Sequence, residues 1–346
     1  MKTSRFSLFI LSLVLPLIIL TSYSNTAAAE QTFPVACTAG AGDVASLKQA
    51  ILDANANSGM DTIVLGEDCI YTLSAVDNTD AFGGPNGLPV ITEDVRFEGQ
   101  NATIQRDPTA ADFRLIYVAS GASIWLEEIT LANGRISNGS GGAIKTQMGA
   151  VNLFKASFLN NHASGVGGAV STMDFYANAS HFEDNSATAN GGAVMVGGLS
   201  SGHFGADDTA FINNTALGWG GAVTALVDSI VTDSHFENNR SGTGEGGAIF
   251  VDAKLHFVYT TFLNNHSDQN GGAVSAFGPL SMVDSIFRGN RSEKNGGALY
   301  NYTTVQTNAT IFEENQAGSV GGAIYTNGYN GGLHSLTDSS FINNQS

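Results

Sequence analysis

The sequence predicts an all-β protein, a right-handed parallel β-helix whose coils are ~25 residues long. Three observations support this fold class. Gly-Gly-Ala followed by Ile, Leu or Val occurs eight times, and Phe-x-x-Asn occurs eight times in alternation with it. No apolar stripe with the 3.6-residue spacing of a helix lasts through a repeat. A fixed period is typical of a solenoid, because one repeat cannot bury its apolar faces without neighbours.

The regular spacing of the two motifs predicts columns of identical side chains along the solenoid. The repeats begin at Gly141, Gly167, Gly191, Gly220, Gly246, Gly271, Gly296 and Gly321. Coils of a parallel β-helix stack ~4.8 Å apart, so the phenylalanines should form one column and the asparagines another. We expect the asparagines to form a structural ladder of amide hydrogen bonds. The ladder residues are Asn161, Asn185, Asn214, Asn239, Asn265, Asn290, Asn315 and Asn344.

Each coil is long enough for three short strands and three turns. Two residues before each Phe stands a small or hydroxyl residue, for example Ala156, Ser180 or Thr209. Because side chains alternate along a strand, this residue and the Phe should point to the same face. Residues three before the Phe would lie on the outward face. The Gly-Gly pair indicates a positive φ or a close approach of two backbones, where a Cβ would clash.

The chain is predicted to have three parts. Residues 1–29 combine basic residues, an apolar run and a small-residue exit, which is typical of a cleaved secretory signal peptide. Residues 30–136 would form an N-terminal cap and irregular first coils, with an amphipathic capping helix over residues 43–57. Residues 137–346 would form the regular repeat β-helix. No segment after the signal peptide is apolar enough to span a membrane.

Charge and cysteines limit the partners and the compartment. The formal net charge is −17, and a chain this acidic repels phosphate backbones, so we expect no nucleic acid partner. The two cysteines, Cys37 and Cys69, both follow the signal peptide. In an exported protein they are expected to form a disulfide, and two separate buried thiols are the alternative.

The chain resembles the chlamydial-type polymorphic outer membrane protein repeat family. The resemblance rests on Gly-Gly-Ala-[Ile/Leu/Val] in register with Phe-x-x-Asn over residues 137–346. The segment SLKQAILDANANSGMDTIVL also resembles the leader region of related secreted bacterial β-helix proteins. The resemblance implies a surface-displayed β-helical passenger, which is an adhesin in the best-known members. It also implies an extracellular or cell-surface location, including association with an outer membrane, and it supplies no catalytic residues.

We therefore expect a non-catalytic adhesin or binding scaffold that is exported to the cell surface. Its partner would be a host or environmental surface molecule, a glycan, or another copy of itself. The rival hypothesis is an extracellular polysaccharide lyase or glycoside hydrolase on a β-helix of the pectate lyase type. Asp208 and Asp233, in adjacent coils, are the two carboxylates that this rival would use.

A row of cations is the sharpest candidate for a ligand-binding site. Arg240, His266 and Arg291 follow the ladder asparagine in three consecutive coils, so they should lie ~4.8 Å apart. Such a row would hold a sulfated or carboxylated glycan through charge-assisted hydrogen bonds. We expect no cofactor and no metal. The glycine-rich match at Gly242–Gly247 overlaps a repeat Gly-Gly and precedes a strand, whereas a dinucleotide fingerprint precedes a helix.

Overall fold

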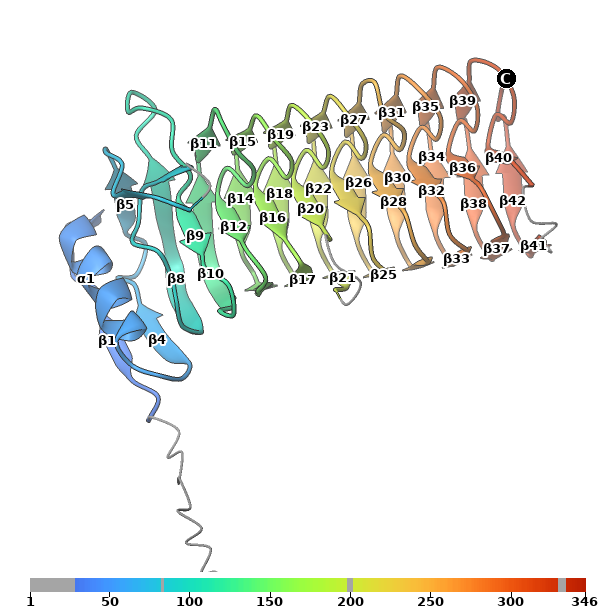
Figure 1. Ribbon diagram of the computed structural model, residues 1–346. Helices are drawn as coiled ribbons and strands as arrows, with labels where there is room; N and C mark the ends of the chain where they lie inside the picture. Colours follow the sequence, from blue (N-terminus) through green and yellow to red (C-terminus); the bar gives the residue numbers. More distant parts are fainter. Residues whose placement is uncertain (1–28, 82–83, 198–201, 329–333) are drawn as a thin grey trace, which may run out of the picture.

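The computed structural model confirms the predicted fold class, a right-handed parallel β-helix with one helix near the N-terminus. It describes residues 29–81, 84–197, 202–328 and 334–346. Successive coils advance along one axis, from the helix at one end to the C-terminus at the other (Figure 1). The predicted signal peptide, residues 1–29, lies outside the described residues except for Ala29.

Each regular coil contributes four strands to three sheets. The strand after each Gly-Gly-Ala belongs to a nine-stranded sheet, which we call the glycine-side sheet. Its strands are β9 (Ile116–Val118), β12 (Ile144–Thr146), β16 (Val170–Thr172), β20 (Val194–Val196), β24 (Val223–Ala225), β28 (Ile249–Val251), β32 (Val274–Ala276), β36 (Leu299–Asn301) and β40 (Ile324–Thr326). The strand after each ladder asparagine belongs to an eight-stranded sheet, which we call the asparagine-side sheet. Its strands are β11 (Arg135–Ile136), β15 (His162–Ala163), β19 (Ser186–Ala187), β23 (Thr215–Ala216), β27 (Arg240–Ser241), β31 (His266–Ser267), β35 (Arg291–Ser292) and β39 (Gln316–Ala317).

The remaining two strands of each coil belong to a 23-stranded sheet, which we call the long sheet. The first of the two is β13 (Ala150–Phe154), β17 (Asp174–Asn178), β21 (Phe204–Asp207), β25 (Ser229–Thr232), β29 (Leu255–Val258), β33 (Leu280–Val283), β37 (Val305–Asn308) or β41 (Ser335–Thr337). The second carries the repeat Phe and is β14 (Ser157–Leu159), β18 (His181–Glu183), β22 (Ala210–Ile212), β26 (His235–Glu237), β30 (Thr261–Leu263), β34 (Ile286–Arg288), β38 (Ile311–Glu313) or β42 (Ser340–Ile342).

The first coils are irregular, as the sequence predicts. Their strands in the long sheet are β1 (Thr32–Pro34), β4 (Asp61–Val64), β5 (Ile70–Leu73), β8 (Val95–Arg106) and β10 (Ile124–Ala132), with the antiparallel pair β2 (Cys37–Thr38) and β3 (Ala41–Gly42). A second antiparallel pair, β6 (Asn78–Thr79) and β7 (Pro85–Asn86), forms a two-stranded sheet of its own.

A left-handed corner explains why a coil has four strands rather than the expected three. The residue three before each Phe has a positive φ and separates the two strands that share the long sheet. These corner residues are Lys155, Ala179, Asp208, Asp233, Tyr259, Asp284, Ala309 and Asp338. The interpretation of this position as part of the outward face of one strand is therefore wrong: it is exposed, but it is a corner. Aspartate is frequent there because its short polar side chain tolerates the left-handed conformation.

The asparagine column is a continuous hydrogen-bond ladder through the core. In the middle of it, Asn239 Oδ1 accepts the backbone N–H of Asn214 at 2.9 Å and its Nδ2 at 3.1 Å. The Nδ2 of Asn239 donates to Oδ1 of Asn265 at 3.0 Å and to the carbonyl oxygen of Phe211 at 2.8 Å. Both N–H groups and both acceptor sites of the amide are used, so burial leaves this side chain no unsatisfied polar atom.

The phenylalanine column packs beside that ladder. From Phe158 to Phe341, neighbouring rings lie 4.6 to 5.0 Å apart between centroids and within 12° of parallel. The hydroxyl residues two before each Phe form a further ladder. Ser234, for example, donates to the carbonyl oxygen of Thr232 at 2.7 Å and accepts the backbone N–H of Thr209 at 3.1 Å. These columns hold successive coils in register without leaving buried polar groups unpaired.

The two glycines of each Gly-Gly pair serve different purposes. The first one, Gly246 for example, has a φ of +72°, a backbone conformation that residues with a side chain rarely adopt. The second one, Gly247, has an ordinary φ, but a Cβ there would lie 2.0 Å from the carbonyl oxygen of Gly272 in the next coil. The two reasons expected from the sequence, a positive φ and a close backbone approach, therefore each apply to one glycine of the pair.

The N-terminal end is closed by the helix and a disulfide. Helix α1 (Val44–Asn55) begins after Asp43, whose carboxylate accepts the backbone N–H groups of the first turn. Its apolar face, which includes Leu47 and Ile51, is buried in the core of the first coils. Nearby, Cys37 and Cys69 form a disulfide. The helix therefore covers the end of the solenoid where no preceding coil would pair with the first strands.

A buried ion pair fastens the loop between β5 and β8 to the regular coils. Arg114 Nη1 lies 2.8 Å from Asp80 Oδ2, and both side chains are almost fully buried. The same guanidinium donates to Asn86 Oδ1 at 2.7 Å and to the carbonyl oxygen of Gly141 at 2.9 Å. Arg114 thus connects the loop to the turn that opens the first Gly-Gly-Ala repeat.

Candidate functional site

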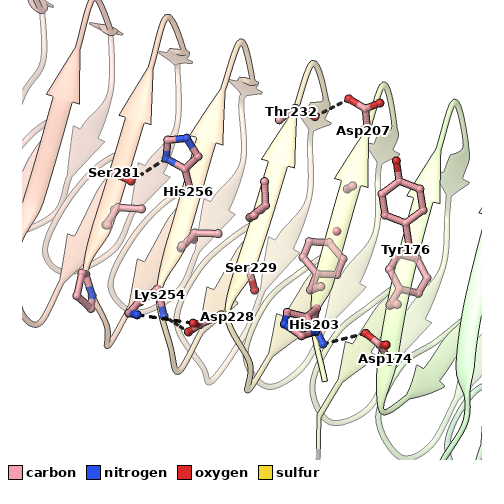
Figure 2. A pocket seen from close by; sticks show the side chains of 18 of the residues that line it. Asp174, Tyr176, His203, Asp207, Asp228, Ser229, Thr232, Lys254, His256 and Ser281 are labelled. Atoms are coloured by element: carbon pink, nitrogen blue, oxygen red, sulfur yellow. Dashed lines mark hydrogen bonds and ion pairs between the residues drawn. The ribbon is translucent and has the colours of Figure 1, made fainter. Parts of the chain in front are cut away.

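A large hollow lies on the outer face of the long sheet. Its volume is about 950 Å³, and it crosses six successive strands, β17, β21, β25, β29, β33 and β37. We call it the groove. Figure 2 shows it from close by, with side chains from several coils along the same face. Every one of these strands pairs with a neighbour on both sides, so the groove is a sheet face and contains no free strand edge.

The floor of the groove follows one register position. The strand pairings align, in successive coils, Tyr176, Gly205, Ile230, His256, Ser281 and Gln306. Gly205 has no side chain to fill its place in this row, and the ring of Tyr176 lies against it: a Cβ there would be 2.8 Å from Tyr176 Cδ2. Tyr176 and Ile230 stay exposed, at 48% and 58%. The ring of Tyr176 therefore occupies the space that a side chain at position 205 would fill, and Ile230 follows in the next coil.

Polar groups at the groove's two margins form hydrogen bonds with neighbouring coils. At one margin, Asp207 accepts hydrogen bonds from Thr232 Oγ1 and from Asn178 Nδ2, the latter at 2.7 Å. At the other margin, Asp174 accepts the backbone N–H of His203 at 2.9 Å (Figure 2). Each carboxylate therefore helps to hold the register of adjacent strands.

The charged side chains of the groove are mostly acidic. Asp228 accepts the backbone N–H of Lys254 at 3.1 Å and lies 3.9 Å from its Nζ. His256 Nδ1 and Ser281 Oγ lie 2.7 Å apart on the floor. Three carboxylates line the groove against one lysine. Like charges repel, so this composition favours neutral or basic ligands over anionic ones. Within the described residues, no group of three or more metal-ligating side chains occurs.

The predicted cationic row lies on another face, in the asparagine-side sheet. The pairings place Arg240 beside His266 and His266 beside Arg291, in register as expected. The carboxylates that follow His266 and Arg291 by two residues, Asp268 and Glu293, compensate the positive charge of the two arginines. Arg240 Nη2 lies 2.8 Å from Asp268 Oδ1, and Arg291 Nη2 lies 2.9 Å from Glu293 Oε1.

His266 is also paired in this row. Its Nε2 lies 2.9 Å from Asp268 Oδ1 and 3.6 Å from Glu293 Oε1. An acidic glycan would have to displace these exposed ion pairs, each of which contributes only ~0–1 kcal/mol to stability. Glycan binding by Arg240, His266 and Arg291 stays a prediction.

The two carboxylates of the rival enzymatic hypothesis are corner residues. Asp208 and Asp233 occupy the same corner in neighbouring coils, with φ of 47° at both positions. Their backbone N–H groups donate to the carbonyl oxygens of Thr232 and Val258 in the next coil. Their spacing is thus inherited from the coil repeat, and their residue type is explained by the backbone conformation.

An aromatic strip on the glycine-side face was not foreseen from the sequence. Phe277 and Tyr302 stack with ring centroids 4.0 Å apart, and Trp219 stacks on Phe250 at 4.9 Å. The carboxylate of Glu245 accepts hydrogen bonds from Ser275 Oγ, Asn270 Nδ2 and the Tyr302 hydroxyl. The sequence does contain a signal for this strip. In the last four coils, an aromatic residue stands one or three positions after the Ile, Val or Leu that follows Gly-Gly-Ala.

We predict that alkaline pH destabilises the protein through its tyrosines. Burial, followed by the nearby Glu245 carboxylate, raises the pKa of Tyr302 far above its usual 10.0, and burial also raises the pKa of Tyr300. Above pH 10 the unfolded chain loses these protons while the folded chain keeps them, so the free energy of unfolding should fall as pH rises, until the folded pKa is reached. Urea unfolding at pH 8, 10 and 11 measures this decrease in the free energy of unfolding.

The matched variant for that experiment is Tyr302→Phe. It keeps the ring that stacks on Phe277 but removes the ionisable hydroxyl, so its free energy of unfolding should fall less steeply above pH 10. Equal slopes for the variant and the original protein would contradict the assignment of the pH dependence to Tyr302.

Comparison with known proteins identifies the repeat. Residues 208–225, 233–252, 259–276, 284–302 and 309–327 match the Chlamydia polymorphic membrane protein repeat. These five segments are similar to the polymorphic membrane protein repeat. The repeats fit a β-helix protein of the cell surface. No curated protein and no solved structure matches the chain. None of the described helices is both long and apolar enough to cross a membrane.

The boundaries of the polymorphic membrane protein repeats follow the architecture of the coil. Each matched segment begins at a left-handed corner, such as Asp233, and continues through the Phe column, the ladder asparagine and the Gly-Gly pair. It ends with or just after a strand of the glycine-side sheet. The groove strands β25, β29, β33 and β37 lie between the matched segments. The repeat therefore specifies the scaffold and leaves the strands beneath the groove outside it.

Proposed function

We propose that the protein is a non-catalytic adhesin of the cell surface, whose groove binds a neutral glycan. The observation that carries this proposal is the position of the groove on strands that the polymorphic membrane protein repeat leaves out. Residues inside the repeat build the ladder, the ring stack and the Gly-Gly turns. On the strands outside it, alternate residues such as Ile230 and His256 point outward and are free to serve recognition, which is how binding sites are commonly added to a rigid scaffold.

The chemistry of the groove favours a glycan over a peptide. Main-chain pairing with an extended peptide needs a free strand edge, and the strands of the groove are paired on both sides. The floor instead offers an exposed aromatic ring, Tyr176, an apolar side chain, Ile230, and polar side chains spaced one coil apart. Flat apolar faces flanked by hydrogen-bonding groups match a sugar chain, which has apolar ring faces and hydroxyl edges. The acidic balance disfavours sulfated or carboxylated chains.

The hydrogen bonds of the groove carboxylates support binding without catalysis. A glycosidase uses two carboxyl groups that face each other across the scissile bond. Here Asp174 and Asp207 lie at opposite margins of the groove, and each accepts hydrogen bonds from the neighbouring coil. Export to the surface is the matching location, since the Cys37–Cys69 disulfide is stable in an oxidising compartment.

The test scores retention and cleavage of glycans together. The purified protein is applied to immobilised neutral and acidic glycans, and both the bound protein and the released sugar are measured. We expect retention on neutral glycans without release. Ile230→Glu, which puts a charge on the groove floor, should abolish retention. Leu217→Glu is the matched control, because Leu217 is similarly exposed, at 52%, but does not line the groove.

Each other outcome would favour a different hypothesis or exclude the groove. Release of sugar would contradict the non-catalytic assignment and favour the rival lyase or hydrolase, with Asp208 and Asp233 then tested by substitution. Retention on acidic glycans alone would move the site to Arg240, His266 and Arg291. Equal retention of the Ile230→Glu and Leu217→Glu variants would exclude the groove as the binding site.

A further inference from the structure

The groove continues beyond Tyr176 into a second hollow. This second cavity has a volume of about 540 Å³ and lies on β8, β10, β13 and β17. Tyr176 lines both cavities and is the wall that they share. Within the second cavity, Arg96, Trp125 and Asn152 lie half-buried on the outer face of the long sheet. Two hollows on one sheet face, separated by a single exposed ring, raise the question of whether one ligand occupies both.

Strand register places the two cavities on one line. Arg96 pairs with Trp125, Trp125 with Asn152, and Asn152 with Tyr176. The same position continues through Gly205 along the groove floor to Gln306. From Arg96 to Gln306 the row has eight coil steps of ~4.8 Å, so it runs for ~38 Å. A straight row of this length fits an extended chain rather than a compact molecule.

Two aromatic residues stand on this line at a regular interval. Trp125 and Tyr176 are separated by one intervening residue of the row, Asn152, so they lie two coils or ~10 Å apart. Both are large rings on a rigid, fully paired sheet, and neither belongs to the buried phenylalanine column. Rings fixed at such an interval present stacking surfaces to alternate units of a regular polymer.

We propose that the two cavities are subsites of one binding site, which holds a single extended neutral glycan lengthwise across the long sheet. Trp125 and Tyr176 stack on its sugar rings, and Asn152 donates to or accepts from the hydroxyls between them. This inference rests on the proposed function and adds its ligand class: a long chain, recognised over many units, rather than a terminal sugar. Affinity then depends on chain length, because a short ligand fills only one subsite.

Calorimetric titration with short and long chains tests this inference. The probes are cello- and chito-oligosaccharides of two and six sugar units. The hexasaccharide should bind at least about tenfold more tightly than the disaccharide. Trp125→Ala and Tyr176→Ala should each weaken hexasaccharide binding about three- to tenfold, since each removes one stacking ring. Trp125→Ala should leave disaccharide binding in the larger cavity unchanged.

The control is an exposed aromatic residue outside both cavities. Tyr259 is 59% exposed at a left-handed corner, and Ala179 and Ala309 occupy the equivalent corner in other coils. Tyr259→Ala is therefore compatible with the backbone and should not change binding. Asn152→Trp, which fills the second cavity without removing a ring, should reproduce the effect of Trp125→Ala and guards against a folding defect in that variant.

The outcomes separate this inference from the proposed function. Equal affinity for two and six units, or hexasaccharide binding that is insensitive to both Trp125→Ala and Asn152→Trp, would overturn the two-subsite inference and leave the proposed function standing. Binding of neither neutral series would overturn both. Binding of oligolysine in place of the oligosaccharides would overturn both in favour of a basic peptide site.

Discussion

Gly247→Ala is expected to destabilise the stacking of the central coils more than any other substitution described above or below. The Cβ of an alanine would lie 2.0 Å from the carbonyl oxygen of Gly272 and 2.7 Å from the carbonyl carbon of His266, both in the next coil. These are backbone atoms held by hydrogen bonds on each side, so no side chain can move to relieve the contact. We expect a loss of at least about 3 kcal/mol in the free energy of unfolding, measured by urea denaturation followed by circular dichroism.

A second glycine separates this steric effect from the effect of backbone conformation. Gly121 has a φ of +95°, and an added Cβ would meet no atom within 4 Å. Gly121→Ala should therefore cost about 1 kcal/mol from backbone strain alone. If Gly247→Ala costs no more than Gly121→Ala, the close approach of the two backbones does not determine the second glycine of the motif.

Asn239→Ala is expected to have the second-largest effect. The substitution removes four hydrogen bonds from a fully buried site. Two N–H groups of Asn214 and the carbonyl oxygen of Phe211 lose their partner in the side chain of residue 239, while Oδ1 of Asn265 keeps only the backbone N–H of that residue. Each buried polar group left unpaired costs about 1–3 kcal/mol. The free energy of unfolding should fall by roughly 4 kcal/mol, which the shift of the urea midpoint measures.

The end of the ladder supplies the control for this substitution. Asn344 accepts two hydrogen bonds from Asn315 and donates one to the carbonyl oxygen of Phe312, but it is only half-buried. Water can reach the groups that Asn344→Ala leaves behind, so its cost should be half that of Asn239→Ala or less. Equal losses at the two sites would mean that the ladder stabilises the coils through side-chain packing rather than through buried hydrogen bonds.

Much of the scaffold could be predicted because each repeat packs against further copies of the same repeat. When identical residues recur at a constant interval in a parallel stack, register places each one above its copy. The Phe column and the asparagine ladder follow from the motif period for that reason. The helix was also predictable, since its apolar spacing places Leu47 and Ile51 on one face; the observed α1, Val44–Asn55, is three residues shorter than the segment 43–57.

The outward faces could not be predicted in the same way. Nothing in the spacing of the cationic row indicates that Asp268 would pair with Arg240, because that contact runs diagonally between coils, or that Glu293 would pair with Arg291 within one coil. The strands of the groove carry no repeated motif, so their sequence does not reveal that the Tyr176 ring lies against Gly205 or that Ile230 is exposed in the next coil. A glycine within the strand FGAD, Gly205, was the one available signal.

The sequence by itself determined the coil, its period and its inward columns, because burial demands the same side chains at the same positions in every repeat. Only the tertiary structure decided where the surface is hollow and which charges are compensated. Those properties depend on residues from different coils that differ in type and meet across the long sheet, such as Trp125, Asn152 and Tyr176. Solvent accepts many side chains at such positions, so no periodic constraint records them in the sequence.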